Sequence, residues 1–160
     1  MSKKDMWSNL ELDSFGVEIP LSQSKSGLID FLREKGIPLH IPTEAQVVIK
    51  SKMFSFDADF LVALHFEGEK LIDITIVPEV MLEGKAMYYR YREIQQVLER
   101  ELGRPGNRLR FILDFLNPDC QLSRWQRNGM KIEHYLLNRF GMEEIISIQL
   151  SSKGRSCEES

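Results

Sequence analysis

The sequence predicts an α+β fold with two layers, an antiparallel β-sheet of about five or six strands (two meanders) covered by two or three helices. Hydrophobic residues alternate with period two over residues 45–77 and again over residues 122–150, which indicates strands. They recur at helical spacing over residues 25–35 and 86–102. The links between successive strands are too short for the crossover that a parallel pair requires, so we expect antiparallel pairing.

The chain of 160 residues fits a single domain with polar ends. Residues 1–12 are polar and of mixed charge and are expected to form a flexible N-terminal arm, whereas residues 13–151 form a single α+β domain. The last residues, 152–160, have the composition of a disordered tail. The domain begins with a short strand over residues 15–19, which Pro20 ends.

The first helix is predicted over residues 25–35. Its apolar residues gather on one face, and they are Leu28, Ile29, Phe31 and Leu32. Either Ser22 or Ser24 can cap the first turn, because a serine side chain accepts a hydrogen bond from a free backbone N–H there. Gly36 follows the helix where a left-handed residue belongs, and Pro38 prevents its continuation.

The clearest pair of strands is predicted at residues 60–66 and 71–77, joined by a short polar turn. In the second strand, Ile72, Ile74 and Ile76 alternate with polar residues. We expect this isoleucine face to be buried, because a slip of one residue would bury Asp73 instead.

The longest helix is predicted over residues 86–102, where an aromatic and aliphatic stripe recurs every three or four residues. Gly103 and Pro105 end it. The following segment, within residues 104–121, fits either a strand or a helix, and the sequence leaves both open.

The second meander contains the strongest turn signal. Asn128-Gly129 supplies the two positive-φ residues of a type I′ hairpin, with strand-like residues on both sides. The strands that follow are predicted at residues 131–137 and 144–150.

Composition limits the compartment and the class of partner. A formal net charge of −3 argues against a general nucleic-acid binder, which would present a basic surplus. No apolar run approaches the ~20 residues that a membrane helix needs, and no secretory h-region follows the N-terminal lysines. The two cysteines, Cys120 and Cys157, are expected to be free thiols, which favours the cytoplasm.

No motif in the sequence carries recognisable chemistry. His40, His65 and His134 are too far apart to form a local metal site, and no glycine-rich loop leads into a helix to hold phosphate. We therefore expect no cofactor and no metal. A small hydrolase or transferase is the alternative, with a site that the fold would assemble from His65, His134, Asp73 and Asp114.

Four residues are the candidates for partner binding: Trp125, Arg127, Tyr135 and Arg139. Tryptophan, tyrosine and arginine dominate interface energetics, because they bury much area and form directed hydrogen bonds. Trp125 and Arg127 fall on one strand face, across the hairpin turn from the strand with Tyr135. An equally good interpretation places Trp125 in the core.

The sequence favours a non-enzymatic, cytoplasmic protein-binding module that acts through an exposed sheet face. Such a module needs no special constellation of residues, only an accessible surface. The order of helices and short meanders is similar to the architecture of small bacterial inhibitor and immunity proteins, without a shared motif. That similarity implies an immunity-like or regulatory role, with another protein as partner or a second copy in a homodimer.

Overall fold

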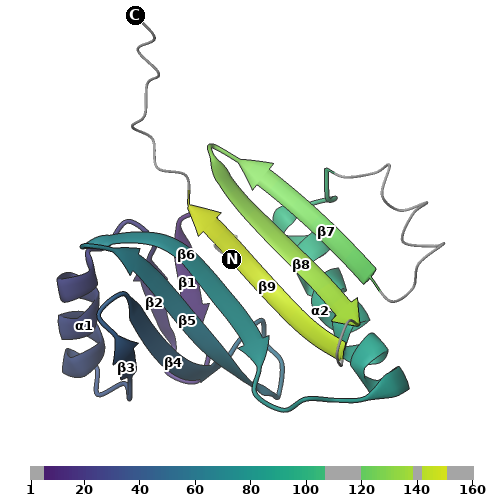
Figure 1. Ribbon diagram of the computed structural model, residues 1–160, viewed down its shortest axis with the longest axis horizontal. Helices are drawn as coiled ribbons and strands as arrows, with labels where there is room; N and C mark the ends of the chain where they lie inside the picture. The colour runs from purple at the N-terminus through teal and green to yellow at the C-terminus, as the bar shows by residue number, and fades with distance from the viewer. Residues whose placement is uncertain (1–5, 107–119, 139–141, 151–160) are drawn as a thin grey trace, which may run out of the picture.

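The computed structural model describes residues 6–106, 120–138 and 142–150. Within these ranges, a two-stranded hairpin accompanies a seven-stranded antiparallel sheet with the strand order β3-β4-β5-β6-β9-β8-β7 (Figure 1). The elements are β1 (Asn9–Leu12), β2 (Val17–Pro20), α1 (Lys25–Glu34), β3 (His40–Thr43), β4 (Gln46–Lys52), β5 (Asp59–Glu67), β6 (Lys70–Pro78), α2 (Gly84–Leu102), β7 (Cys120–Arg127), β8 (Met130–Asn138) and β9 (Met142–Leu150).

The predicted fold class is wrong in the size of the sheet and in what covers it. The described residues form a sheet of seven strands rather than five or six, and two meanders join along β6 and β9. They contain two helices, and a separate hairpin, β1–β2, shares the covering role with them. The prediction failed because β3 is four exposed residues with a proline, and it shows no alternation to detect.

The positions of the longer elements were predicted correctly. The strands expected at residues 60–66, 71–77, 131–137 and 144–150 are β5, β6, β8 and β9, and the helices expected at residues 25–35 and 86–102 are α1 and α2. Residues 9–12, which were expected within the N-terminal arm, form β1, and both Leu10 and Leu12 are buried. Residues 1–5 of that arm, the tail 152–160 and most of segment 104–121 lie outside the described residues.

Local signals explain where the elements begin and end. Ser24 is the N-cap of α1, and its hydroxyl accepts a hydrogen bond from the backbone N–H of Gly27 at 3.2 Å. Gly36 has φ +66°, the left-handed conformation expected after the helix. At the β7–β8 turn, Asn128 and Gly129 have φ values of 49° and 79°, which confirms the predicted pair of positive-φ residues.

A register shift in β6 corrects the predicted isoleucine face. Ile74 and Ile76 are buried as expected, but Ile72 is only partly buried. The pairing of β5 with β6 shifts between His65 and Phe66, so that Leu71 joins the buried face in place of Ile72. A one-residue irregularity of this kind reverses the alternation beyond it, and the sequence gives no sign of it.

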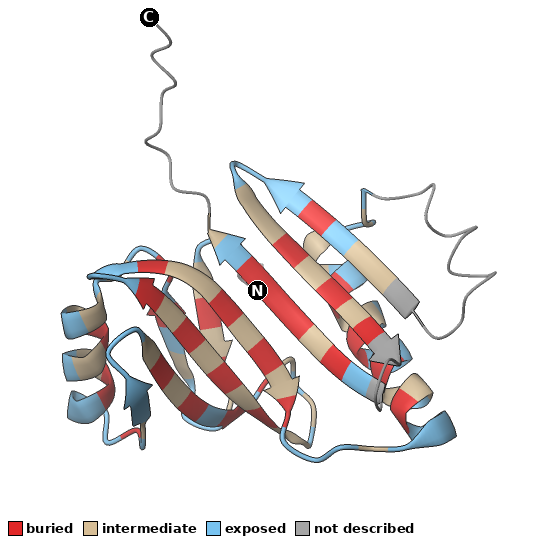
Figure 2. Ribbon diagram, viewed as in Figure 1, coloured by how far each residue is buried: buried red, intermediate tan, exposed pale blue. Residues whose placement is uncertain are grey.

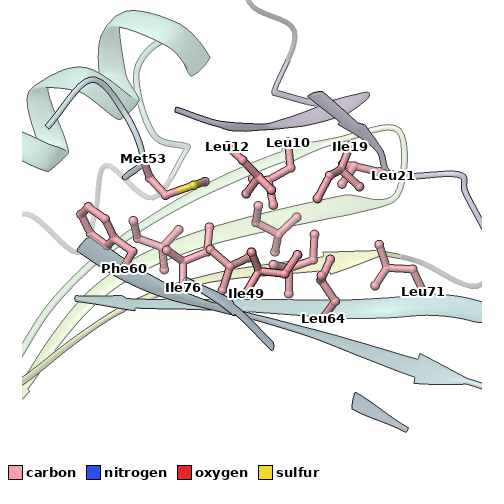
Figure 3. Close-up of a cluster of buried hydrophobic side chains, with 14 of the residues drawn as sticks. Leu10, Leu12, Ile19, Leu21, Ile49, Met53, Phe60, Leu64, Leu71 and Ile76 are labelled. Atoms are coloured by element: carbon pink, nitrogen blue, oxygen red, sulfur yellow. The ribbon is translucent and has the colours of Figure 1, made fainter. Parts of the chain in front are cut away.

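One face of the large sheet is covered, and this face holds the core. Buried and partly buried residues alternate along β5 and β6 (Figure 2). Leu10, Leu12 and Ile19 point from the hairpin toward the sheet, where they meet side chains that include Phe60 and Ile76 (Figure 3). Complete burial of such a side chain stabilises the fold by roughly 1.5–3 kcal/mol.

Helix α2 covers the same face farther along, over β7, β8 and β9 (Figure 1). Its buried side chains are Met87, Tyr91, Ile94 and Leu98, which follow the stripe predicted for this segment. Neither helix in the described part of the chain is long and apolar enough to cross a membrane.

Candidate functional site

The second face of the seven-stranded sheet has no described helix or strand over it (Figure 1). We call this surface the open face. The strand register arranges its central side chains in rows across β5, β6, β9, β8 and β7. These residues are Leu61, Ala63, His65, Asp73, Thr75, Val77, Ile145, Ser147, Gln149, Lys131, Glu133, Tyr135, Leu122, Arg124 and Gln126.

Polar side chains in the middle of the open face bind one another. The hydroxyls of Ser147 and Thr75 donate to the carboxylate of Asp73, each at 3.3 Å. The Glu133 carboxylate forms ion pairs with Arg124 at 2.6 Å and with Lys131 at 3.5 Å. A partner that packs here therefore meets carboxylates that already have hydrogen-bond or ion-pair partners, which lowers the desolvation cost of an interface.

An apolar row flanks these polar groups. Leu61 lies opposite Val77, and Tyr135 lies between Ile145 and Leu122 in the register. All five side chains are partly buried against their neighbours. Burial, together with the nearby carboxylates of Glu133, Asp73 and Glu143, raises the pKa of Tyr135, so its hydroxyl keeps its proton and can donate to a partner.

The structure separates the four predicted binding residues. Tyr135 lies on the open face, whereas Trp125 is 3% exposed and belongs to the core under α2. The Trp125 indole N–H donates to the backbone carbonyl of Gly103 at 2.7 Å. Arg127 is exposed at the end of β7, and Arg139 lies outside the described residues. A role for these residues in binding stays a prediction.

The four residues of the alternative enzymatic site are not brought together in the described part of the chain. His65 and Asp73 are cross-strand neighbours on the open face. His134 has no exposed surface and lies on the covered face, while Asp114 is outside the described residues. The described residues also contain no group of three or more side chains suited to hold a metal ion.

A buried polar network surrounds His134, and sequence reasoning did not anticipate it. The imidazole Nε2 lies 3.0 Å from Oε1 of Glu144, and Nδ1 lies 2.7 Å from Oε1 of Gln95. Arg90 donates from Nε to Oε2 of Glu144 at 3.0 Å. The ring of Tyr91 stacks on the imidazole with centroids 4.1 Å apart. These contacts tie α2 to β8 and β9.

The network controls the protonation of His134. Burial lowers the pKa of the imidazole, and the hydrogen bond to Glu144 and the charge of that carboxylate oppose this effect. The side chains of His134 and Glu144 are inaccessible to solvent, so they cannot contact a substrate in this structure. The role of the network is structural, because it holds α2 against β8 and β9.

A sequence signal for the network did exist. Residues two apart in a strand lie on the same face. Glu144 therefore lies on the face of Ile146 and Ile148, and His134 lies on the face of Ile132 and Leu136. Two ionisable residues on otherwise apolar strand faces indicate a buried pair.

Comparisons with known proteins give no match: no family model, no curated protein and no solved structure is similar to this chain.

Proposed function

We propose that the protein is a cytoplasmic, non-enzymatic protein-binding module that receives its partner on the open face. The observation that carries this proposal is the open face, a broad surface that no described helix or strand covers and that combines an apolar row with internally paired charges. Apolar side chains next to polar groups on one accessible surface are typical of interaction sites.

The residue types on the open face support a protein partner. Tyr135 offers a protonated hydroxyl beside an apolar ring and is flanked by Ile145 and Leu122. A tyrosine in such a setting often contributes a large share of the binding free energy of an interface. The ion pairs of Glu133 lie beside this apolar row, and they fix the orientation of a partner more than its affinity.

The arrangement favours binding over hydrolysis or group transfer. An acid–base mechanism needs titratable side chains within reach of the reacting atoms, and His134, one of the residues of the alternative enzymatic site, has none of its surface exposed. On the open face, the carboxylate oxygens of Asp73 are taken up by Ser147 and Thr75. An immunity-like or regulatory protein would act by occluding a partner through this face.

A photo-crosslinking amino acid placed at residue 135 tests the proposal. Tyr89 is the matched control, because it is also a tyrosine but is 66% exposed on α2, which covers the other face of the sheet. In cells, we expect a discrete crosslinked protein from position 135 and none from position 89. Equal products at both positions, or none at position 135, would contradict the proposal.

The same experiment identifies the partner class. A product whose mass equals two copies of this chain would indicate a homodimer through the open face, whereas a different protein would be identified from its peptides. Either product supports the proposal that the open face binds a protein. Crosslinks to nucleic acid alone would overturn that proposal.

A further inference from the structure

A cavity of about 300 Å³ lies on the covered side of the sheet, between the β1–β2 hairpin, the turn at residues 53–55 and α2. Its lining combines side chains from these three places, which are distant in the sequence. It is separate from the open face, because none of its lining residues belongs to that surface. Its volume is at the lower end of the range for small-molecule sites, roughly 300–1,000 Å³.

Apolar side chains form much of the cavity wall. Leu10 and Met53 are almost completely buried, and Met6 and Val97 contribute from the chain before β1 and from α2. Phe54 is held by an edge-to-face contact with Phe60, with ring centroids 5.9 Å apart. Figure 3 shows Met53 facing Leu12 and Leu10 across this part of the core.

The charged residues of the lining are unbalanced. Four carboxylates, from Glu11, Asp13, Glu18 and Glu101, accompany one guanidinium, from Arg100. Arg100 already donates to Glu101 at 3.2 Å. Glu11 has an interaction of its own, and without it the lining still has a formal excess of two negative charges, which attracts a cation and repels an anion.

The turn that forms one wall has an unusual backbone. Phe54 and Ser55 have φ values of 59° and 61°, although neither is a glycine. L-residues with side chains rarely adopt this left-handed conformation. The backbone N–H of Ser55 donates to the Asp13 carboxylate at 2.7 Å, which holds the turn against the hairpin. The wall is thus fixed before any ligand arrives, which favours binding because little ordering remains to be done.

We propose that this cavity binds a small molecule with an apolar body and one ammonium group. The apolar body packs against Met53, Phe54 and Val97, and the ammonium group lies among the carboxylates of the lining. A neutral analogue fills the same space without the charge attraction, and an anionic analogue adds repulsion. The proposal is independent of partner binding at the open face, since the two sites share no residue.

Three probes with similar bodies test the charge preference: phenethylammonium, phenethyl alcohol and hydrocinnamate. Isotope-labelled methionine methyl groups report binding by NMR, because Met6 and Met53 line the cavity and Met130 does not. We expect saturable shifts of the Met6 and Met53 signals with the ammonium compound, at an affinity roughly tenfold or more above that of the alcohol. Hydrocinnamate should leave the signals unchanged.

Substitutions in α2 test the location. Val97→Phe fills the cavity and should weaken phenethylammonium binding about tenfold or more. Gln96→Phe is the matched control, because Gln96 is the exposed neighbour outside the lining and its substitution should change nothing. If Val97→Phe disturbs folding, Glu18→Gln on the exposed side of β2 replaces it. This variant should reduce the preference for the ammonium compound over the alcohol, whereas Glu34→Gln on α1 should not.

Equal affinity for all three probes, or a preference for the carboxylate, would overturn the proposal. So would the absence of any shift at about 10 mM phenethylammonium, a concentration that fills sites with a Kd of roughly 1 mM. Unchanged titrations in both Val97→Phe and Glu18→Gln would also place the binding elsewhere.

Discussion

The covered face of the sheet has two halves that are stabilised in different ways. Over β4, β5 and β6, the hairpin contributes leucine and isoleucine side chains to an apolar core. Over β7, β8 and β9, helix α2 adds a network of ionisable and amide side chains around His134. The hairpin half depends on buried area, which is non-directional. The helix half also depends on hydrogen bonds, which fix one position of the helix and fail when one member is lost.

The largest effect is expected from Glu144→Ala in the helix half. The substitution leaves the partly buried Arg90 and the buried His134 without their shared acceptor, so it should lower the free energy of unfolding by about 3–5 kcal/mol. Chemical denaturation measures this. Glu133→Ala is the matched control, because its ion pairs lie on the open face, and it should cost about 1 kcal/mol or less. Equal losses in both variants would contradict the distinction between the network and the open face.

Leu12→Ala tests the hairpin half. The side chain is completely buried between the hairpin and the sheet, so its truncation should cost about 2–5 kcal/mol through lost burial and a residual cavity. Denaturant titration at neutral and mildly acidic pH should give nearly the same loss, because no titratable group is removed. A loss that varies strongly with pH would show that the two halves are not independent.

The smallest expected effect is a pH dependence confined to the helix half. Burial lowers the pKa of His134 below its ordinary value of 6.5, so the unfolded chain binds a proton more readily than the folded one. Stability should therefore be complete above pH 6.5 and fall as the pH decreases through the lowered pKa, by at most about 1.4 kcal/mol per pH unit.

Other groups near His134 also bear charge, namely Glu144 and Arg90 in direct contact and Glu99 through Gln95. The comparison is therefore between wild type and His134→Gln, which removes only the imidazole. Thermal melts across mildly acidic pH should show a shallower loss in this variant. Parallel curves for the two proteins would mean that His134 does not cause the dependence.

The sequence was sufficient for elements whose signals are local. Alternation located β5, β6, β8 and β9, and the serine pair Ser22 and Ser24 together with Gly36 marked the ends of α1, where Ser24 is the cap in the structure. It was insufficient for the joining of β6 to β9, because the paired residues Ile74 and Ile148 lie far apart in the chain and nothing in either strand specifies the other.

The candidate site was predicted only in part, for a related reason. Alternation separates the two faces of a strand but does not say which face a helix will cover. Tyr135 and Trp125 both have interface-like chemistry, yet the position of α2 puts one on the open face and the other in the core. The cavity was not foreseen, since its walls come from segments that meet only in the folded chain.

The junction of β6 with β9 also has a consequence during translation. The chain leaves the ribosome from its N-terminus, so β3 to β6 can form their meander while β9 has not yet been synthesised. Until then, the outer backbone of β6 around Ile74 and Ile76 is an unpaired sheet edge with apolar side chains. At about 5–20 residues per second, the synthesis of β9 follows that of β6 by several seconds, and in that interval the unpaired edge makes the nascent chain prone to aggregation.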